Sequence, residues 1–457
     1  MTSRDGPSLS RRHVLTTMAA SGATLLVGAG TGGAAPAAAP PRKPGQASVF
    51  GLRHPPMETV RVGIIGVGAR GNSLLGNLLD LDRVRVTAVC DLVPQRVEAA
   101  RHRVTKAGQP EPAGFSAGET DFENLCRRDD VDIVYIATPW DSHVPMALAA
   151  MKNGRHAAIE VPAAISLEEC WQLVDTAEQT RRHCIMLENC CYGETEMLVL
   201  SMVRRGVFGE VTHGEAGYLH GPADGLIRQA SGAVWRRRFV QKFNGNLYPT
   251  HGLGPVAQYM GIHGGDRFER LVSMSSPERA LSAVRDRLPE GDPRRAETYA
   301  CGDVNTSILR TARGRTILVQ FDIVTPRPYS RINMICGTEG AFRDYPPRIH
   351  LRGKPNEWET DLAPYHEAYG HPLWKQYKEA AVRSGGHGGM DYVMNRRLIA
   401  CLLAGEPLDM TVYDAAAWSS VFPLSIASVA GGGAPILFPD FTRGEWRDRE
   451  PLGIVGA

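Results

Sequence analysis

The first half of the chain contains a short glycine-rich turn that leaves few folds open to it. An apolar run from residue 60 leads into Gly66, Gly68 and Gly71, spaced as in G-x-G-x-x-G, and a helical pattern follows. Glycines at these positions let the chain turn tightly, let a pyrophosphate approach the backbone and let the helix pack on the strand. Because the same spacing also occurs in simple tight turns, its meaning depends on a second feature.

Asp91 is that second feature. It ends the next apolar run, 20 residues after Gly71, which is the spacing at which a carboxylate reaches the ribose hydroxyls of a dinucleotide. The turn and Asp91 together predict a dinucleotide site, against the alternative of a glycine turn and a helix-capping aspartate. A carboxylate repels a 2′-phosphate, so Asp91 favours NAD over NADP. Arg70 keeps NADP open, because a guanidinium in this turn can reach a phosphate.

The order of apolar runs and helical patterns predicts an α/β fold with two domains. Between residues 58 and 188 short runs, apolar on both faces, alternate with helical patterns at 94–107, 142–153 and 166–181, which predicts an NAD-binding Rossmann domain with a doubly wound parallel sheet. From 189 to 457 longer, alternating strands predict a C-terminal α/β domain for substrate binding and dimerisation, with a large open, mostly antiparallel sheet. Helical patterns return at 373–383, 391–404 and 412–429.

Residues 1–47 differ in composition from the rest of the chain. Arg11 and Arg12 precede an apolar stretch rich in alanine and glycine, and small residues with prolines continue to about Pro44. This pattern predicts a twin-arginine signal with a linker, and so a periplasmic or secreted protein. A disordered tail with a chance Arg-Arg pair is the alternative. The stretch is too short and too rich in glycine for a stable membrane span.

Charge and cysteine content exclude some partners. A net charge of +2 and basic residues spread along the chain argue against nucleic acid. The nine cysteines have no metal-ligand spacing, and neither do the histidines and carboxylates. We therefore expect mostly buried thiols and no metal site.

Further candidates for the cofactor site come from the ends of the later strands. In a doubly wound sheet the carboxyl ends of the strands line the crevice that binds the ligand. Residues there are predicted to border the cofactor: Trp140, Asp141, Ser142 and His143 after the fourth strand, and Glu160 and Asn189 after the next two. His143 has an alternative role as the cap of the helix that follows.

These features resemble the Gfo/Idh/MocA oxidoreductase superfamily from about residue 60 to the end of the chain. In that superfamily the strand after the TPxxxH-like turn usually ends in Glu-Lys-Pro, with the lysine beside the reacting alcohol. This chain has Glu160-Val161-Pro162 instead. The ammonium that would stabilise a developing alkoxide is absent, so another group must handle that proton.

Several longer stretches resemble one branch, the NAD-dependent glycosidases of glycoside hydrolase family 109, typified by α-N-acetylgalactosaminidase. They are LEECW (167–171), MLENCCYG (186–193), NLYPTHGLGP (246–255), RPYS (327–330), GTEG (337–340), HPLW (371–374), GGHGGMDY (385–392) and VYDAAAW (412–418). The resemblance implies hydrolysis of N-acetylgalactosaminides or related α-glycosides without net redox change. Carbon 3 is oxidised transiently, the aglycone is eliminated, water adds, and carbon 3 is reduced again.

The resemblance and the residue types together assign roles. An imidazole exchanges protons near neutral pH, so His251 is expected to act as base at the carbon 3 hydroxyl, with Tyr248 in support. Tyr192 is a candidate for carbon 2 or the leaving group, with a buried structural tyrosine as its alternative. Glu160 is either a base or a residue that orients the nicotinamide. The remaining assignments are Tyr218, Pro249, Thr250 and Tyr329 near the substrate, and Val161 and Arg236 near the cofactor.

Two departures from the family leave the identity of the sugar substrate open. The segment from Tyr218 to Trp235 is short, and Cys190-Cys191 occupies the family's ENxCY position. An exported sugar oxidoreductase with tightly bound NAD(P) is the main alternative function, and a sugar-binding protein without activity is another. A homo-oligomer is expected, because the broad second sheet commonly pairs in relatives.

Overall fold

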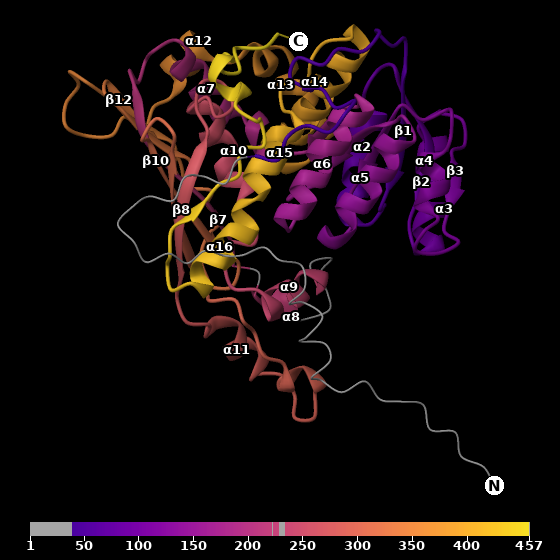
Figure 1. Cartoon of the computed structure of the whole chain (residues 1–457), viewed down its shortest axis with the longest axis horizontal. Coiled ribbons are helices and arrows are strands. Elements are labelled where there is room, and N and C mark those ends of the chain that lie inside the picture. Colours follow the sequence, from indigo (N-terminus) through magenta and orange to yellow (C-terminus); the bar gives the residue numbers. More distant parts are fainter. Residues whose placement is uncertain (1–38, 222, 228–233, 457) are drawn as a thin grey trace. The chain divides into compact units, whose positions relative to one another are not determined.

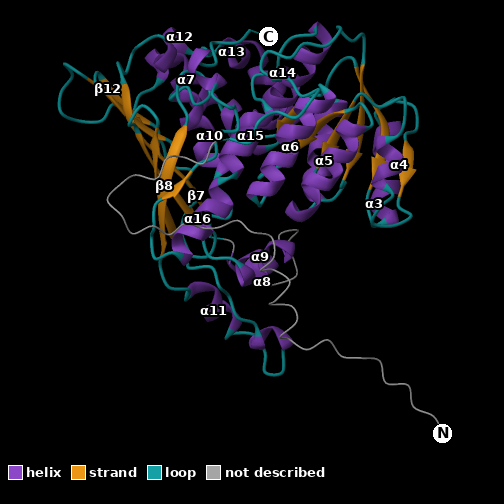
Figure 2. Cartoon of the chain, viewed as in Figure 1, coloured by secondary structure: helices purple, strands orange, loops and turns teal. Residues whose placement is uncertain are grey.

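The computed structural model describes residues 39–221, 223–227 and 234–456, and the predicted export signal lies outside them. From residue 38 onward the chain forms one compact unit. Two β-sheets and the helices around them build this unit (Figures 1 and 2).

The first sheet is parallel throughout. Its strands lie in the order β3-β2-β1-β4-β5-β6. Successive strands are added to one side of β1 and then, from β4 on, to its other side. Doubly wound folds bind nucleotides at this point between β1 and β4. The strands are β1 (Val60–Ile65), β2 (Val84–Cys90), β3 (Ala113–Phe115), β4 (Ile133–Ile136), β5 (His156–Ile159) and β6 (Cys184–Met186). The connecting helices are α2 (Ala69–Leu79), α3 (Pro94–Lys106), α4 (Phe122–Cys126), α5 (His143–Lys152) and α6 (Leu167–Thr180). The predicted Rossmann sheet is confirmed.

The second sheet has eight strands in the order β13-β12-β11-β7-β10-β9-β8-β14. All neighbouring strands are antiparallel except β7 and β10, so the predicted mostly antiparallel sheet is also confirmed. The strands are β7 (Val211–Leu219), β8 (Phe268–Ser275), β9 (Asn305–Thr311), β10 (Thr316–Asp322), β11 (Met334–Gly337), β12 (Gly340–Arg343), β13 (Arg348–Leu351) and β14 (Ile436–Leu437).

Helices from the second half lie between the two sheets in Figure 1. They include α10 (Thr250–Tyr259), α15 (Val412–Ser419) and α16 (Val421–Ala430). A Cβ atom on Gly252 would lie 2.3 Å from the backbone nitrogen of Gly217, so this glycine lets α10 lie directly on β7. The predicted helix at 412–429 is divided in two at Ser420, and Pro423 has no N–H with which to continue the ladder there.

Residues 42–56 pack on the fold, although the sequence placed the fold boundary near residue 47. Arg42 pairs with Glu178 of α6 at 3.0 Å and with Glu445 at 2.7 Å, and the Tyr413 hydroxyl accepts a hydrogen bond from the Val49 N–H at 3.1 Å. The Ala47 carbonyl also accepts a hydrogen bond from Arg181 at 2.9 Å, so a small residue of this segment contacts the fold through its backbone.

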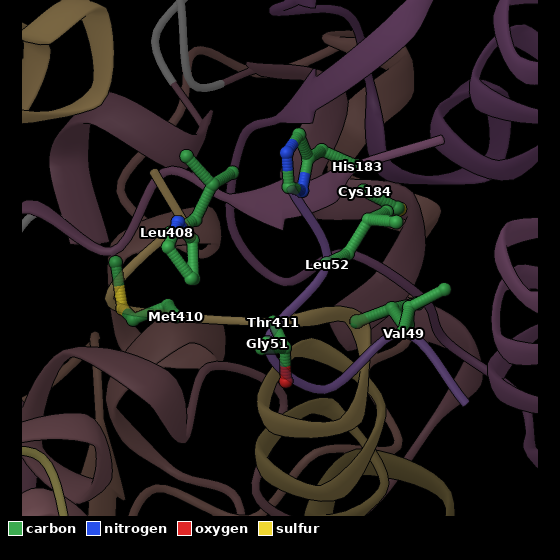
Figure 3. Close-up of a pocket in the computed structure, with 10 residues that line it drawn as sticks. Val49, Gly51, Leu52, His183, Cys184, Leu408, Met410 and Thr411 are labelled. Atoms are coloured by element: carbon green, nitrogen blue, oxygen red, sulfur yellow. The ribbon is translucent and has the colours of Figure 1, made fainter. Parts of the chain in front are cut away.

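This segment, residues 407–412 and the start of β6 enclose a small cavity. Figure 3 shows Leu408 and Met410 on one side of it, across from Val49 and Leu52. His183 also lines this cavity, and none of the lining residues is a predicted site residue. Figure 3 therefore shows how the N-terminal segment is attached.

A cluster of three histidine rings lies where the N-terminal segment packs on the fold. It predicts that the folded protein loses stability as the pH falls. The rings of His54, His156 and His183 lie 4.5 to 5.1 Å apart. Burial, with the charges of His54 and Arg182, lowers the pKa of His183 from 6.5 to about 3. A lowered folded-state pKa means that stability is present above pH 6.5 and is lost as the pH falls toward 3. Between pH 7 and pH 5 we expect His183 to cost on the order of 2 kcal/mol of unfolding free energy.

Urea unfolding at the two pH values measures this loss. His183→Gln should reduce the pH dependence, whereas His102→Gln, which changes an exposed histidine on α3, should leave it unchanged. An equal pH dependence in wild type and His183→Gln would contradict the assignment.

All nine cysteines lie in the described residues as free thiols, and eight of them are buried, as predicted. Among the residues that the structure describes, no helix combines the length and apolar character needed to cross a bilayer.

Candidate active site

The glycine turn has the geometry that a dinucleotide site requires. Gly66 has φ +85°, and a Cβ atom on it would lie 2.7 Å from the Ala137 carbonyl oxygen. A Cβ on Gly71 would lie 1.8 Å from the Gly66 carbonyl oxygen, whereas at Gly68 the nearest atom would be 3.7 Å away. Gly66 and Gly71 are therefore required for the backbone to fold into this turn. Gly68 instead leaves open space above the turn for a pyrophosphate.

Asp91 lies beside this turn, at the end of β2. Its carboxylate accepts hydrogen bonds from the Val67 N–H at 3.0 Å and the Val93 N–H at 2.9 Å. These bonds fix the predicted ribose-binding carboxylate next to the glycine turn. The glycines and Asp91 thus fit an NAD molecule.

Arg70 is engaged by carboxylates. Its Nε donates to Glu160 at 2.6 Å, and its Nη1 and Nη2 donate to Asp391 at 2.7 and 3.1 Å. A guanidinium held in this way is not directed at a 2′-phosphate, so the argument for NADP from Arg70 loses its basis. Arg70 also brings Glu160, which follows β5, to the glycine turn.

The residues after β4 are held by the backbone. Trp140 donates from Nε1 to the Val161 carbonyl at 3.1 Å. His143 is fully buried, and its ring nitrogens lie 2.9 Å from the Pro162 carbonyl and 2.8 Å from the Thr138 carbonyl. In this arrangement His143 positions two strand-end loops and has no exposed surface for a ligand.

Of the two residues between them, Asp141 is exposed and Ser142 is half-buried. Asp141 forms an ion pair with Arg238 at 2.5 Å, and the Ser142 N–H donates to the Pro139 carbonyl at 3.0 Å. Asp141 thereby links the loop after β4 to α9 (Arg237–Lys242) in the second half of the chain.

A group of aromatic side chains from the second half meets the first half at Trp140. The ring of Tyr248 lies 5.8 Å from Trp140, 4.4 Å from Tyr218 and 4.9 Å from His251. Tyr329 lies 6.0 Å from Tyr218. Four of the predicted substrate and catalytic residues are therefore gathered at the crevice.

His251 is oriented by a carboxylate that sequence reasoning missed. Glu188 follows β6 and is fully buried, and its Oε1 lies 2.7 Å from Nδ1 of His251. Nε2 of the same ring lies 3.3 Å from the Tyr248 hydroxyl. Burial alone would raise the pKa of Glu188, but the charge and hydrogen bond of His251 bring the pKa below its ordinary value. An ionised Glu188 holds a proton on Nδ1 and leaves Nε2 as the basic nitrogen.

The same region holds a group of potential metal ligands. Donor atoms of Glu188, Cys190 and His251 lie within 4.8 Å of one another, although the sequence shows no metal spacing. The fold creates the proximity, because His251 is 63 residues from Glu188. His251 Nδ1 already bonds to Glu188, so the arrangement is explained by proton chemistry, and the absence of a metal stays a prediction.

Arg236 supplies positive charge to the tyrosines. Its guanidinium carbon lies 5.0 Å from the ring centre of Tyr248, 5.3 Å from Trp235 and 5.7 Å from Trp140. Burial raises the pKa of both Tyr248 and Tyr218, and the charge of Arg236 opposes this rise. Arg236 therefore favours negative charge at Tyr248 and Tyr218.

The other residues of the YPTH turn, Pro249 and Thr250, lie at the start of α10. Pro249 precedes α10, and Thr250 begins that helix with no exposed surface. Their position at the start of α10 directs His251 toward Glu188, and the Thr250 side chain is close enough to Glu188 to help lower the pKa of its carboxyl group.

Tyr192 lies apart from this group. Its hydroxyl donates to Asp409 at 3.1 Å, and Asp409 is paired with Arg397 at 2.9 Å. Burial, with the charge of Asp409, raises the pKa of Tyr192 well above its ordinary value. Within the described residues no hydrogen bond or ring contact joins Tyr192 to Tyr248 or His251, which favours a buried structural tyrosine.

Matched removal of the two hydroxyls tests this difference. We expect Tyr192→Phe to lower thermal stability, because one buried hydrogen bond to Asp409 is lost, and to change kcat less than about threefold. Tyr248→Phe should lower kcat about 10- to 100-fold, because its hydroxyl faces His251. Turnover and melting temperature of both variants measure the effects. A larger loss of kcat in Tyr192→Phe would return this residue to the catalytic group.

Comparison with known proteins identifies two families. Residues 60–188 match the oxidoreductase family with an NAD-binding Rossmann fold, and residues 192–448 match the C-terminal domain of glycosyl hydrolase 109. A glycosyl hydrolase family 109 protein of Solibacter usitatus is 52% identical over 408 residues, covering 89% of this chain and 93% of the relative. One from Saccharopolyspora erythraea is 50% identical, covering 98% and 97%.

Solved structures share the fold at low identity. Levoglucosan dehydrogenase in complex with NADH and levoglucosan has a TM-score of 0.63 at 19% identity, covering 84% of this chain and all of that one. The scyllo-inositol dehydrogenase of Lactobacillus casei with NAD(H) and scyllo-inositol has a TM-score of 0.60 at 13% identity, covering 83% and 99%. The predicted family and cofactor are confirmed: this chain belongs to glycosyl hydrolase family 109 and binds NAD through its Rossmann domain.

Proposed function

We propose that this protein is a glycosidase that hydrolyses N-acetylgalactosaminides or related α-glycosides, with NAD bound throughout and without net redox change. The observation that carries the proposal is His251, held by Glu188 at Nδ1 and facing Tyr248 with Nε2, beside a nucleotide site that has Val161 in place of lysine. The names of the relatives support the hydrolase class.

His251 begins the reaction. Its Nε2 accepts the proton of the carbon 3 hydroxyl, and ionised Glu188 stabilises the imidazolium that forms. NAD, when bound, supplies the acceptor and later the donor for the hydrogen on carbon 3. Glu160 and Asn189 stand at the carboxyl ends of β5 and β6, where they would orient the nicotinamide end.

A ketone at carbon 3 acidifies the hydrogen on carbon 2. This proton passes to solvent. Tyr248 and Tyr218 stay protonated because burial raises their pKa, so next to Arg236 they are suited to stabilise the enolate oxygen and to donate a proton to the glycosidic oxygen as it leaves. The bond from carbon 1 to the glycosidic oxygen then breaks, and the aglycone leaves as an alcohol after gaining a proton. Water adds across the carbon 1–carbon 2 double bond. The sum is one glycoside and one water converted to one sugar and one alcohol.

We also propose that the protein is exported folded by the twin-arginine route and acts as an oligomer on glycans outside the cytoplasm. Export of the folded chain agrees with NAD taken up before export. Met274 on β8 and Ile308 on β9 are large exposed apolar residues of the second sheet, which supports pairing through this sheet.

A glycoside deuterated at carbon 2 tests the reaction. We expect cleavage of an aryl N-acetylgalactosaminide with exchange of the label into solvent and no accumulation of NADH. A cleaved product that keeps all its label would exclude elimination. Stoichiometric oxidised sugar without cleavage would instead support the alternative, a sugar oxidoreductase that retains its NAD.

A further inference from the structure

Another cavity lies at the C-terminal end of α10, the helix that carries His251 near its start. Its volume is about 210 Å³, many times the space that one water molecule needs. Residues within 50–51, 258–264, 407–418 and 449–452 line it, and none of them is a predicted site residue. Gln258, on its wall, lies about 10 Å from His251 along the helix axis. The cavity can therefore hold a small organic molecule at a place other than the crevice.

Two polar side chains that are more than nine-tenths buried line this cavity with hydrogen-bonding atoms to spare. Gln258 is 8% exposed and His263 is 7% exposed. Nδ1 of His263 lies 2.9 Å from Oδ1 of Asp414. Among the residues that the structure describes, neither Nε2 of this ring nor the side-chain amide of Gln258 has a hydrogen-bond partner. Because buried polar groups are normally hydrogen-bonded, these two groups fit a ligand that brings its own donors and acceptors.

His263 is held at the cavity wall by a tight turn and by Asp414. It has φ +66°, a conformation that few non-glycine residues adopt, and its N–H donates to the Asp266 carbonyl at 2.7 Å. Asp414 also accepts hydrogen bonds from the Thr411 N–H at 2.8 Å and the Thr411 hydroxyl at 3.0 Å. An ionised Asp414 keeps a proton on Nδ1 of His263. Nε2, on the other side of the ring, is then left as a hydrogen-bond acceptor.

The charges around the cavity favour a neutral ligand. Asp409 accepts a hydrogen bond from Nη2 of Arg397 at 2.9 Å, and Asp414 is engaged as described above. Arg449 and Glu450 add one charge of each sign. An anion would meet the carboxylates of Asp409 and Asp414, and a cation would find both of them already paired. Hydroxyl groups suit such a wall, because each of them can both donate and accept.

We propose that this cavity is a second binding site, for a neutral molecule that carries several hydroxyl groups on one ring, a monosaccharide or a cyclitol. One hydroxyl donates to Nε2 of His263, and others exchange hydrogen bonds with the amide of Gln258. Ile262, Leu408 and Leu452 supply apolar wall, against which the C–H groups of the ring pack. The inference goes beyond the glycosidase reaction and does not depend on it.

Titration calorimetry with galactose and, separately, with myo-inositol tests this site on the full chain with NAD bound. Gln258→Met keeps the length of the side chain but removes the amide. His263→Asn tolerates positive φ and keeps an amide donor for Asp414 but lacks Nε2. We expect each variant to weaken one binding event at least tenfold. An event with galactose alone identifies a sugar site, and one with myo-inositol alone identifies a cyclitol site.

Two further variants separate the cavity from the crevice. Tyr329→Ala changes a predicted substrate residue that is 38% exposed, and it should leave the event at the cavity unchanged. Gln172→Met makes the same chemical change as Gln258→Met at an exposed position on α6. It should leave every binding event unchanged.

Binding that Gln258→Met and His263→Asn both leave unchanged would overturn the proposal, as would binding of neither probe. If these variants do not fold, a crystal structure of the wild-type chain with each probe decides. A ring in contact with Gln258 and His263 supports the site, and ordered water alone in the cavity overturns it. Failure to cleave any glycoside leaves these binding measurements intact, so the two proposals fail separately.

Discussion

Replacing His251 with alanine is expected to lower kcat for glycoside cleavage by about 10³-fold, within the range that general acid–base groups contribute. The imidazole is the group whose basic nitrogen faces the crevice, and its partner Glu188 is buried beneath it. NAD should stay bound, because His251 touches neither the glycine turn nor Asp91. Turnover of an aryl N-acetylgalactosaminide and nucleotide content per chain are the two measurements.

Glu188→Gln is the matched variant for this result. Glutamine keeps the shape and a hydrogen-bonding oxygen but removes the charge that stabilises the imidazolium, so we expect a smaller loss of about 10- to 100-fold. A His251→Ala protein with activity within a few-fold of wild type would remove the base from the proposed mechanism. Retained sugar affinity with no wild-type activity to lose would instead indicate a binding protein.

The glycine turn and Asp91 could be predicted from the sequence. Glycines that must avoid a side chain, and a carboxylate at the end of the second strand, are local requirements, so their spacing is visible in the chain. The apolar runs likewise predicted the parallel sheet, because strands buried on both faces have few alternatives.

The sequence was weaker wherever a partner comes from far along the chain. Glu188 and His251 are 63 residues apart, and Arg70 and Asp391 are 321 apart, so no spacing reveals either pair. Tyr192, which the sequence offered either for catalysis or as a buried structural tyrosine, shows another limit. It follows β6 closely, but the 3₁₀ turn Asn189–Tyr192 directs its ring toward Asp409. Nearness to a strand end does not decide which way a side chain points.

Two alanine substitutions in the glycine turn should separate folding from nucleotide binding. A methyl group on Gly71 would lie 1.8 Å from the Gly66 carbonyl oxygen, which cannot move without displacing the turn, whereas one on Gly68 meets nothing closer than 3.7 Å. We expect Gly71→Ala to lose NAD and to be destabilised by about 3 kcal/mol or more, at the upper end of overpacking effects. Gly68→Ala should keep the wild-type melting temperature without nucleotide and bind NAD at least tenfold more weakly, because its methyl group occupies only the space open to the pyrophosphate.

Calorimetric unfolding without nucleotide, and titration with NAD, measure the two effects. Equal melting temperatures for both variants would show that the turn adapts to a side chain, and would remove the steric basis for the NAD site at Gly71.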